Sequence, residues 1–297
     1  MSDVRTRVDL AELTAITDTR PVRRRKPGQV VLVAVILVLA AGGVATLVVN
    51  PNFDWPTVGK YLFDVSVWRG IAVTLELTLY AMVIGIVLGV VLAVLRQSEN
   101  PVARLTAGAY IWFFRGTPVL VQVLFWGFAA SLFPRIGLGV PGGDFLFSFD
   151  TNTVIPIFAA AMLGLGLNEA AYMAEIVRGG LLSVPRGQTE AAGVLGLNKM
   201  STLRFVVLPQ AMRVIIPPVG NQVISMLKMT SVVLVIGVRD LLGSVTEIYS
   251  RNYRQIALLL VACIWYLAMT TVLSFLQARL EKRFGRSLSP LRSVREG

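Results

Sequence analysis

Six long runs of apolar residues determine what this chain can fold into. They lie near Val30–Val49, Ile71–Leu95, 102–133, Val154–Ile176, Ala211–Val238 and Gln255–Leu276. A helix of about 20 apolar residues crosses the roughly 30 Å hydrocarbon core of a bilayer. The composition agrees, because 55% of the 297 residues are hydrophobic and only 15% are charged. The sequence therefore predicts an all-α polytopic membrane protein with six transmembrane helices.

The basic residues are divided unequally between the two sides of the predicted spans. If the N-terminus lies in the cytoplasm, 20 of the 28 lysines and arginines fall in inner segments and six in outer loops. Cytoplasmic segments of membrane proteins are enriched in basic residues, so the sequence predicts that both termini lie inside (N-in, C-in). The net charge of +11 is then a topology signal, and no nucleic acid partner is expected.

The residue inventory excludes several kinds of chemistry. The chain has no histidine, and its single cysteine, Cys263, lies inside an apolar run. Catalytic Ser-His-Asp and Cys-His groups, a disulfide framework and metal sites built on histidine or cysteine are therefore excluded. The nucleotide-binding pattern G-x-x-x-x-G-K-[ST] does not occur. We expect no catalytic residue, no metal and no cofactor bound by this chain, so that any ATP must bind to another protein.

The third apolar run contains a break. A continuous helix over 102–133 would be about 48 Å long, which exceeds the roughly 30 Å hydrocarbon core. Arg115-Gly116-Thr117-Pro118 interrupts the run, and proline disrupts helical hydrogen bonding. The break is therefore expected near or inside the membrane, where its freed backbone groups must line a cavity or be covered by protein.

Other local signals complete the predicted topology. Gly85-x-x-x-Gly89 predicts close packing of the second span against another helix. Residues 50–70 and 134–153 are rich in proline and glycine and are predicted outer loops, the first with a short helix at the membrane interface. Pro217-Pro218 is expected to break the fifth run near its start.

The segment Gly187–Pro209 is too polar to lie in the membrane, and the charge distribution places it in the cytoplasm. Glu190 and the two alanines after it begin a good helix-forming stretch, which Gly196 is expected to end. Glu190 could interact there with the helix dipole. Ser201 is expected to cap a second short helix, which Pro209 ends or kinks. We predict an exposed helix-turn-helix between two spans.

Four motifs resemble the polar-amino-acid subfamily of bacterial ABC-importer permeases. The loop has the spacing of the family's EAA loop, in the residues Gly187, Glu190, Ala191, Ala192, Gly196, Leu208 and Pro209. The run Phe114-Arg115-Gly116-Thr117-Pro118 is followed by Gln122, and Ala171-Tyr172 by Ala174-Glu175. Lys228-x-Thr230-Ser231 is the fourth match.

The resemblance implies the type I importer fold, a five-helix permease core with one additional N-terminal helix. Residues 1–28 would be a cytoplasmic basic tail and 29–60 the additional helix and its outer loop. Residues 61–280 would form the permease domain, with 187–209 as the cytoplasmic coupling loop, and 281–297 a second cytoplasmic tail.

The same resemblance implies the assembly in which the chain works. The chain would be a multi-pass subunit of the bacterial cytoplasmic (inner) membrane, paired with a second permease, either the same or a paralogous chain. Two ABC ATPase subunits would bind the coupling loops and carry ATP and Mg. An extracytoplasmic amino-acid-binding protein would deliver the substrate, a polar or charged amino acid.

The break and the fourth span supply the candidate substrate contacts. Amides freed at the break suit a carboxylate, and Arg115 either pairs with the same group or extends to the inner interface. Glu169 lies on the same helix face as Tyr172 and could hold an amino group. The expected substrate-binding residues are Arg115, Gly116, Thr117, Pro118, Gln122, Asn168, Glu169 and Tyr172.

Several other polar residues in the spans have either structural or substrate roles. Glu175 is expected to form a structural pair with Arg178 three residues later. Lys228 is expected to pair with a carboxylate, and Glu76 faces either the substrate or another subunit. The residues in this group are Glu76, Glu175, Lys228, Thr230 and Ser231.

Three other functions compete with this interpretation. An ABC permease for a different solute would lack the motifs around Arg115 and Tyr172. An ion-coupled secondary transporter for a small polar solute could use the membrane glutamates as proton carriers, but it predicts an inverted repeat, and none is evident. A membrane enzyme is disfavoured because histidine and paired membrane aspartates are lacking.

Overall fold

The computed structural model describes residues 27–139 and 145–285, so most of the two predicted tails lies outside the described residues. The chain divides into two compact units, Met1–Phe53 and Asp54–Gly297. The first contains α2 (Pro27–Val49) and the short η1 (Pro51–Phe53). The large apolar side chains of α2 are exposed along its length, as expected of a helix surrounded by lipid.

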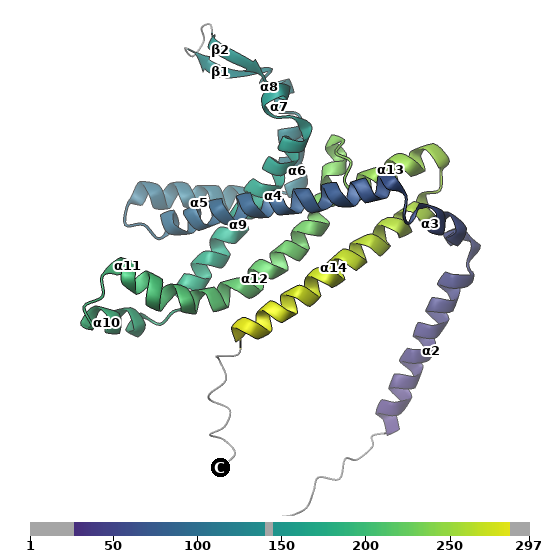
Figure 1. Cartoon of the computed structure of the whole chain (residues 1–297), viewed down its shortest axis with the longest axis horizontal. Coiled ribbons are helices and arrows are strands. Elements are labelled where there is room, and N and C mark those ends of the chain that lie inside the picture. The colour runs from purple at the N-terminus through teal and green to yellow at the C-terminus, as the bar shows by residue number, and fades with distance from the viewer. Residues whose placement is uncertain (1–26, 140–144, 286–297) are drawn as a thin grey trace, which may run out of the picture. The chain divides into compact units, whose positions relative to one another are not determined.

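The second unit is a bundle built around four long helices (Figure 1). These are α4 (Val65–Arg96), α9 (Ile157–Leu182), α12 (Leu208–Met229) and α14 (Gln255–Gly285). The short helix α3 (Trp55–Tyr61) precedes α4. In the described residues, five helices are long and apolar enough to span a membrane, or six if one bent pair is counted. The predicted all-α membrane fold is confirmed.

The glycine pair of the second span brings α4 and α9 into close contact. A Cβ atom on Gly85 would lie 2.6 Å from Cγ of Glu169, and one on Gly89 would lie 3.0 Å from the backbone nitrogen of Ala174 and collide with Cβ of Met173. Only glycine permits this approach, so the packing predicted from Gly85-x-x-x-Gly89 is present.

We expect Gly89→Ala to destabilise the bundle, because the added methyl group must push α9 away from α4. Such overpacking costs about 1–3 kcal/mol. Gly179→Ala, also on α9, is the matched control, since a Cβ there has nothing within 4 Å. Thermal unfolding of the purified protein in detergent should show a lower midpoint for Gly89→Ala only. Equal midpoints for the two variants would contradict the close packing.

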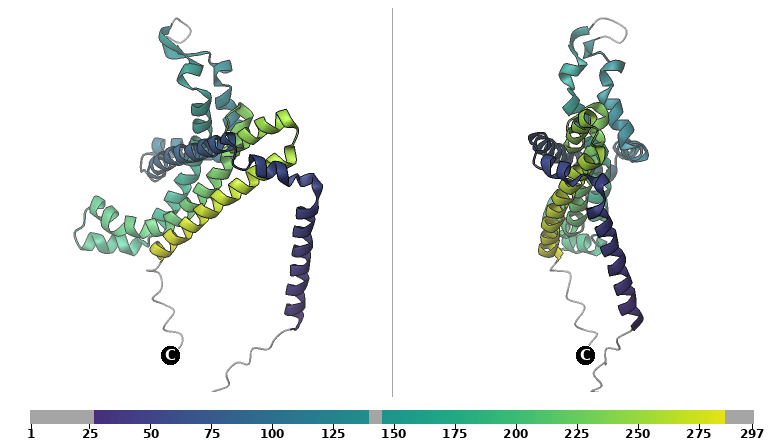
Figure 2. Two further views of the ribbon diagram at one scale, coloured as in Figure 1. Left: turned by 45° about the vertical axis from the view of Figure 1, so that its right-hand side comes forward. Right: turned by 90° about the vertical axis from the view of Figure 1, so that its right-hand side faces the viewer.

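The predicted break in the third run is also present. Helix α5 (Pro101–Gly116) ends there, and α6 (Val119–Gly127) leaves at an angle of 99°. The chain continues through α7 (Ala129–Leu132) and forms an arm that projects away from the bundle (Figure 2).

The end of this arm differs from the sequence-based expectation. Instead of a loop over 134–153, the chain forms an antiparallel hairpin of β1 (Arg135–Gly139) and β2 (Phe145–Asp150), followed by α8 (Thr151–Val154). The alternation of phenylalanine with other residues at 145, 147 and 149 is the period of a strand. The nearby glycines and prolines obscured this signal.

The segment Gly187–Pro209, the predicted coupling loop and called the coupling segment from here on, forms two helical pieces, as predicted, but its ends differ. Its first helix is α10 (Arg186–Val194), and α11 (Lys199–Thr202) with the wide turn η2 (Leu203–Val207) leads directly into α12. Asn198, not Ser201, is the cap, because its side chain accepts the Ser201 amide at 2.9 Å.

Of the prolines expected to interrupt this region, Pro217 and Pro218 do not, whereas Pro209 directly follows a wide turn at the start of α12. Pro209 lies in the first turn of α12, where a missing amide hydrogen bond is tolerated, and Leu208 N bonds to Leu203 O in the wide turn before it. Pro217 and Pro218 lie inside α12, which continues through both. Contacts with neighbouring helices offset the lost hydrogen bonds.

The return segment between the last two spans is fixed by a buried carboxylate. After η3 (Thr230–Ile236), Asp240 caps α13 (Leu241–Asn252) by accepting the Gly243 amide at 2.9 Å. Its other oxygen accepts the Tyr266 hydroxyl at 3.0 Å. Burial raises the pKa of the Asp240 carboxyl above its usual value.

Candidate functional site

The coupling segment presents apolar side chains at its tip. Val194 and Leu195 are 88% and 80% exposed, whereas Ala192 is buried and anchors α10. Gly196 has a φ of 77°, a left-handed conformation that favours glycine, and its turn is closed by a hydrogen bond of 3.0 Å from Leu197 N to Ala192 O. An exposed apolar tip on a rigid turn suits insertion into a groove of another protein.

Glu190 does not lie in the first turn of α10, where it could interact with the helix dipole. Helix α10 begins at Arg186, so Glu190 is in its second turn, beyond the reach of the N-terminal partial charge. Its side chain is exposed. The expected dipole interaction is therefore wrong, while a contact with a basic group of a partner remains a prediction.

The coupling segment is mechanically joined to a membrane span. Residues Lys199–Ile236 form one helical run, and the Gln210 side chain on α12 donates to Val206 O at 2.9 Å and reaches Gln188 Oε1 on α10 at 3.5 Å. The second helical piece of the segment is therefore continuous with α12, and Gln210 links α12 to α10.

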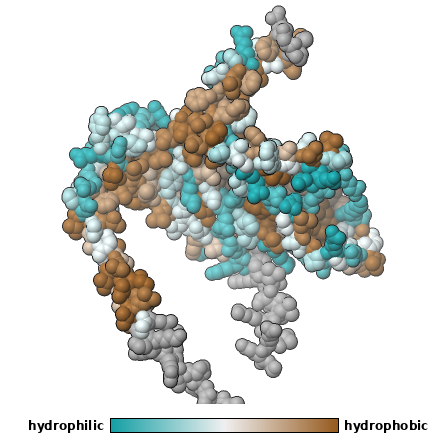
Figure 3. Space-filling view, turned by 180° about the vertical axis from the view of Figure 1, so that it is seen from behind, coloured by the Kyte–Doolittle hydropathy of each residue, from teal (hydrophilic) through white to brown (hydrophobic). Residues whose placement is uncertain are grey.

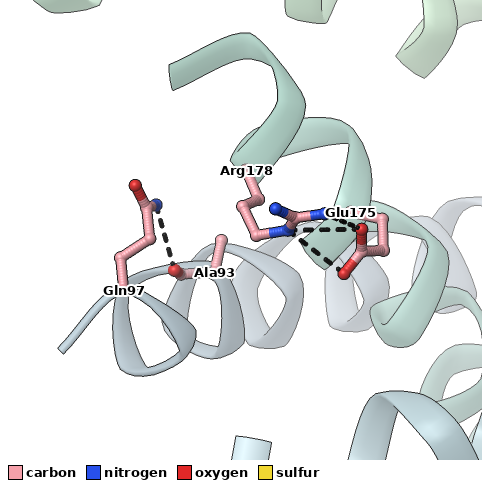
Figure 4. Close-up of polar contacts among 4 residues, drawn as sticks. All are labelled: Ala93, Gln97, Glu175 and Arg178. Atoms are coloured by element: carbon pink, nitrogen blue, oxygen red, sulfur yellow. Dashed lines mark hydrogen bonds and ion pairs between the residues drawn. The ribbon is translucent and has the colours of Figure 1, made fainter. Parts of the chain in front are cut away.

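At the nearby end of α9, Glu175 and Arg178 form the expected structural pair (Figure 4). Arg178 Nη2 lies 2.6 Å from Glu175 Oε2, and Arg178 Nε is 3.3 Å from both carboxylate oxygens. On α4, the Gln97 side chain donates to Ala93 O at 3.2 Å, which completes the last turn of that helix. Both arrangements stabilise helix ends.

Two amide side chains cover the backbone groups freed at the break. Gln122 Nε2 donates to Phe114 O at 3.0 Å, Thr117 O at 3.1 Å and Thr117 Oγ1 at 2.7 Å. Asn168 Nδ2, from α9, donates to the same Phe114 O at 2.9 Å. The break is thus held by two side-chain amides, and one buried acceptor, Gln122 Oε1, remains unpaired within the described residues.

The cationic part of the break lies at the surface of the subunit. Arg115 stacks over the Tyr172 ring, with its Cζ atom 5.4 Å from the ring centroid. Both side chains are exposed, as are Gly116 and Pro118. The structure thus places Arg115 and Tyr172 together where a substrate or a second subunit could reach them.

Glu169 lies apart from this surface. It is 4% exposed, and its carboxylate accepts the Gln222 amide of α12 at 3.0 and 3.3 Å. Gln222 was missed by the sequence interpretation. Its polarity inside an apolar run was the available signal, because polar groups within spans are seldom without function. The two residues connect α9 to the helix that leads from the coupling segment.

The remaining polar residues divide by exposure. Glu76 on α4 and Lys228 on α12 are exposed on the bundle surface. Thr230 is buried and donates to Leu227 O at 2.8 Å, and Ser231 donates to Lys228 O at the same distance. No cluster of three or more metal-binding side chains occurs among the residues that the structure describes.

Comparisons with known proteins agree with this architecture. Residues 85–286 match the family described as binding-protein-dependent transport system inner membrane component. The chain is 44% identical over 273 residues to the arginine transport system permease protein ArgU of Corynebacterium glutamicum. The aligned region covers 92% of this chain and 85% of that protein.

Two further relatives extend the comparison. Identity to the glutamine transport system permease protein GlnP of Escherichia coli K12 is 35% over 239 residues, covering 78% of this chain and 98% of GlnP. The crystal structure of an amino acid ABC transporter with histidines superposes with a TM-score of 0.63 at 34% identity, covering 73% of this chain and 94% of that one.

Proposed function

This chain belongs to the binding-protein-dependent transport system inner membrane components, and we propose that it carries a polar or charged amino acid across the cytoplasmic membrane as the permease subunit of an ABC importer. The observation that carries the proposal is its similarity to an arginine permease over 92% of its length. The exposed tip at Val194 and Leu195, on a rigid turn joined to a span, supports the coupling role.

The proposed assembly contains two ATPase subunits, which bind ATP and Mg, and a second permease. An extracytoplasmic binding protein delivers the amino acid. When ATP closes the ATPases, the two coupling segments are drawn together, and α12 passes this movement to the pathway. The distribution of basic residues supports placing α10 and α11 in the cytoplasm, with both chain termini on the same side.

The proposed substrate contacts follow from the chemistry of the described residues. Arg115 suits the α-carboxylate of an amino acid, and Gln122 Oε1 can accept from its ammonium group. The Glu169 carboxylate could bind a cationic group of the substrate when α9 and α12 separate during transport. The choice of the carried amino acid also depends on the binding protein, which selects what reaches the permease.

The test is uptake of a panel of labelled amino acids by proteoliposomes that contain the permease, its ATPase and its binding protein. We expect uptake only with ATP on the ATPase side, unaffected by ionophores that collapse ion gradients. The main alternative, an ion-coupled secondary transporter, predicts the opposite on both counts: uptake by the chain alone, abolished by ionophores. An ATP-independent, ionophore-sensitive signal would overturn the proposal.

A further inference from the structure

A cavity of about 430 Å³ lies between the start of α4 and the helix α13. Figure 1 shows α13 at the end of the bundle opposite the coupling segment, and the surface over α13 is hydrophilic (Figure 3). The coupling segment is cytoplasmic in the proposed function, so this cavity lies on the extracytoplasmic side. That is the side from which a binding protein delivers the amino acid.

The cavity is lined by three arginines and one glutamate, namely Arg69 on α4, Arg239 just before α13, and Glu247 and Arg251 on α13. We call these four residues the basic pocket. Glu247 Oε2 lies 2.9 Å from Arg239 Nε, and Glu247 Oε1 lies 2.6 Å from Arg251 Nη2. Arg69 forms no ion pair among the residues that the structure describes. One carboxylate therefore serves three cations, and the pocket keeps an excess of positive charge.

The guanidinium groups of the basic pocket remain accessible to an anion. Each guanidinium carries five N–H donors, and the closest contact of each pair with Glu247 involves one nitrogen. The side chains of Arg239 and Arg251 are 74% and 76% exposed, and Arg69 is exposed as well. Because a guanidinium and a carboxylate can form two parallel hydrogen bonds, an acidic side chain fits these donors.

The helix face below the basic pocket argues against a lipid as its occupant. Arg69, Val73 and Glu76 follow one another at spacings of four and three, so they share one face of α4. Arg69 and Val73 line the cavity, and Glu76 is exposed one turn further along the helix. The acyl chains of a lipid with its headgroup in the pocket would lie against this carboxylate, which is unfavourable in hydrocarbon. This face of α4 is therefore turned towards water or protein.

Two other occupants fit the charge and exposure less well. A second copy that presented the same face across a two-fold axis would bring like charges together, which is repulsive. A free amino acid would be held too weakly, because an exposed ion pair strengthens binding by only about five-fold. The same pairs are sufficient to guide a protein that makes further contacts elsewhere.

We propose that the basic pocket receives an acidic side chain of the extracytoplasmic binding protein when that protein docks. The proposal rests on the proposed function, and it names the surface and the chemistry through which the binding protein is recognised. Exposed charges of complementary sign accelerate association and fix the orientation of the partners. They suit a partner that docks and leaves in each transport cycle.

The test measures ATP hydrolysis by the permease–ATPase complex in nanodiscs while the liganded binding protein is added. Arg69→Gln should raise the concentration of binding protein that gives half-maximal stimulation by about three-fold, the effect of one exposed charge pair. Arg69→Glu adds repulsion and should raise it by about 10-fold. Arg69→Lys keeps the charge and should lie close to the wild type. Raising the salt concentration should reduce these differences.

Arg254→Gln is the matched control, because it removes the same charge next to α13. Arg254 pairs with Asp54 at 3.2 Å and does not line the cavity, so its loss should leave the half-maximal concentration unchanged. A wild-type value for Arg69→Glu would overturn the proposal. Equal shifts for Arg69→Gln and Arg254→Gln would also overturn it, because they would show an effect of overall charge and not of the pocket.

A cross-link identifies the occupant directly. In a Cys263→Ser background, which removes the only cysteine, Ser66→Cys places a thiol in the lining of the cavity. A photoreactive group attached there should capture the binding protein, whereas the same group on Ser98→Cys, just beyond the other end of α4, should not. Capture of lipid or of a second permease by Ser66→Cys would overturn the proposal.

The outcome is separable from that of the proposed function. If Arg69→Glu needs no more binding protein than the wild type while ATP-driven uptake persists, the docking inference fails and the proposed function stands. If the wild-type complex shows no ATP-driven uptake, the proposed function itself fails.

Discussion

Replacing Val194 and Leu195 together by glutamate is expected to abolish ATP-driven uptake while leaving the permease in the membrane. Both side chains lie at the tip of the coupling segment, 88% and 80% exposed, so neither supports the fold. If they fill a groove of the ATPase, each behaves as an interface anchor that contributes about 2 kcal/mol or more. Their loss would then weaken ATPase binding roughly 1,000-fold.

The measurement is the amount of ATPase that co-purifies with the permease from membranes, together with uptake. A double variant with Val194→Ile and Leu195→Met keeps the apolar character and serves as the control, which should retain both activities. Glu190→Gln tests the separate prediction of a basic partner group, and a smaller loss is expected because one exposed charge pair contributes little. Wild-type co-purification of the double glutamate variant would remove the tip from the docking surface.

Local chemistry explains which parts of this molecule were predictable. The break at Arg115–Pro118 and the contact at Gly85 and Gly89 follow from what glycine and proline do to their own backbone, so short motifs were sufficient. Pro209, Pro217 and Pro218 show the limit of the same reasoning. A wide turn and neighbouring helices accommodate them, and neither is visible in the residues beside each proline.

The candidate site shows the same division. The pair Glu175–Arg178 is a contact within one helix, set by a spacing of three, and it was predicted. The bond between Glu169 and Gln222 joins residues 53 positions apart, which no spacing rule relates. Asn168 and Gln122 were selected as ligands of a substrate, which stays a prediction, and the structure adds that their amide nitrogens hold the helix break, which the sequence interpretation missed. A polar residue in a span signals a need for a partner without indicating which one.

Replacing Glu169 by glutamine is expected to reduce uptake by roughly 10- to 100-fold, the effect of losing one charge-assisted hydrogen bond of about 1.5–3 kcal/mol. The substitution keeps the shape of the side chain, and its carbonyl oxygen can still accept from Gln222. Packing against Gly85 should therefore persist, so the amount of protein in the membrane should change little.

The matched control is Glu175→Gln, the same change six residues further along α9. That carboxylate is paired with Arg178, so its loss should lower the midpoint of thermal unfolding and leave the substrate concentration at half-maximal uptake unchanged. Glu169→Gln should instead leave the midpoint of thermal unfolding unchanged and alter the substrate concentration at half-maximal uptake. The contrast has a physical basis: Glu175 has a cationic partner within its own helix, whereas Glu169, among the described residues, is bonded to the neutral amide of Gln222. A buried carboxylate without a cation is expensive to keep, and an amino acid that brings a positive charge would offset that cost. Normal uptake by Glu169→Gln would leave the carboxylate as a structural tie between α9 and α12.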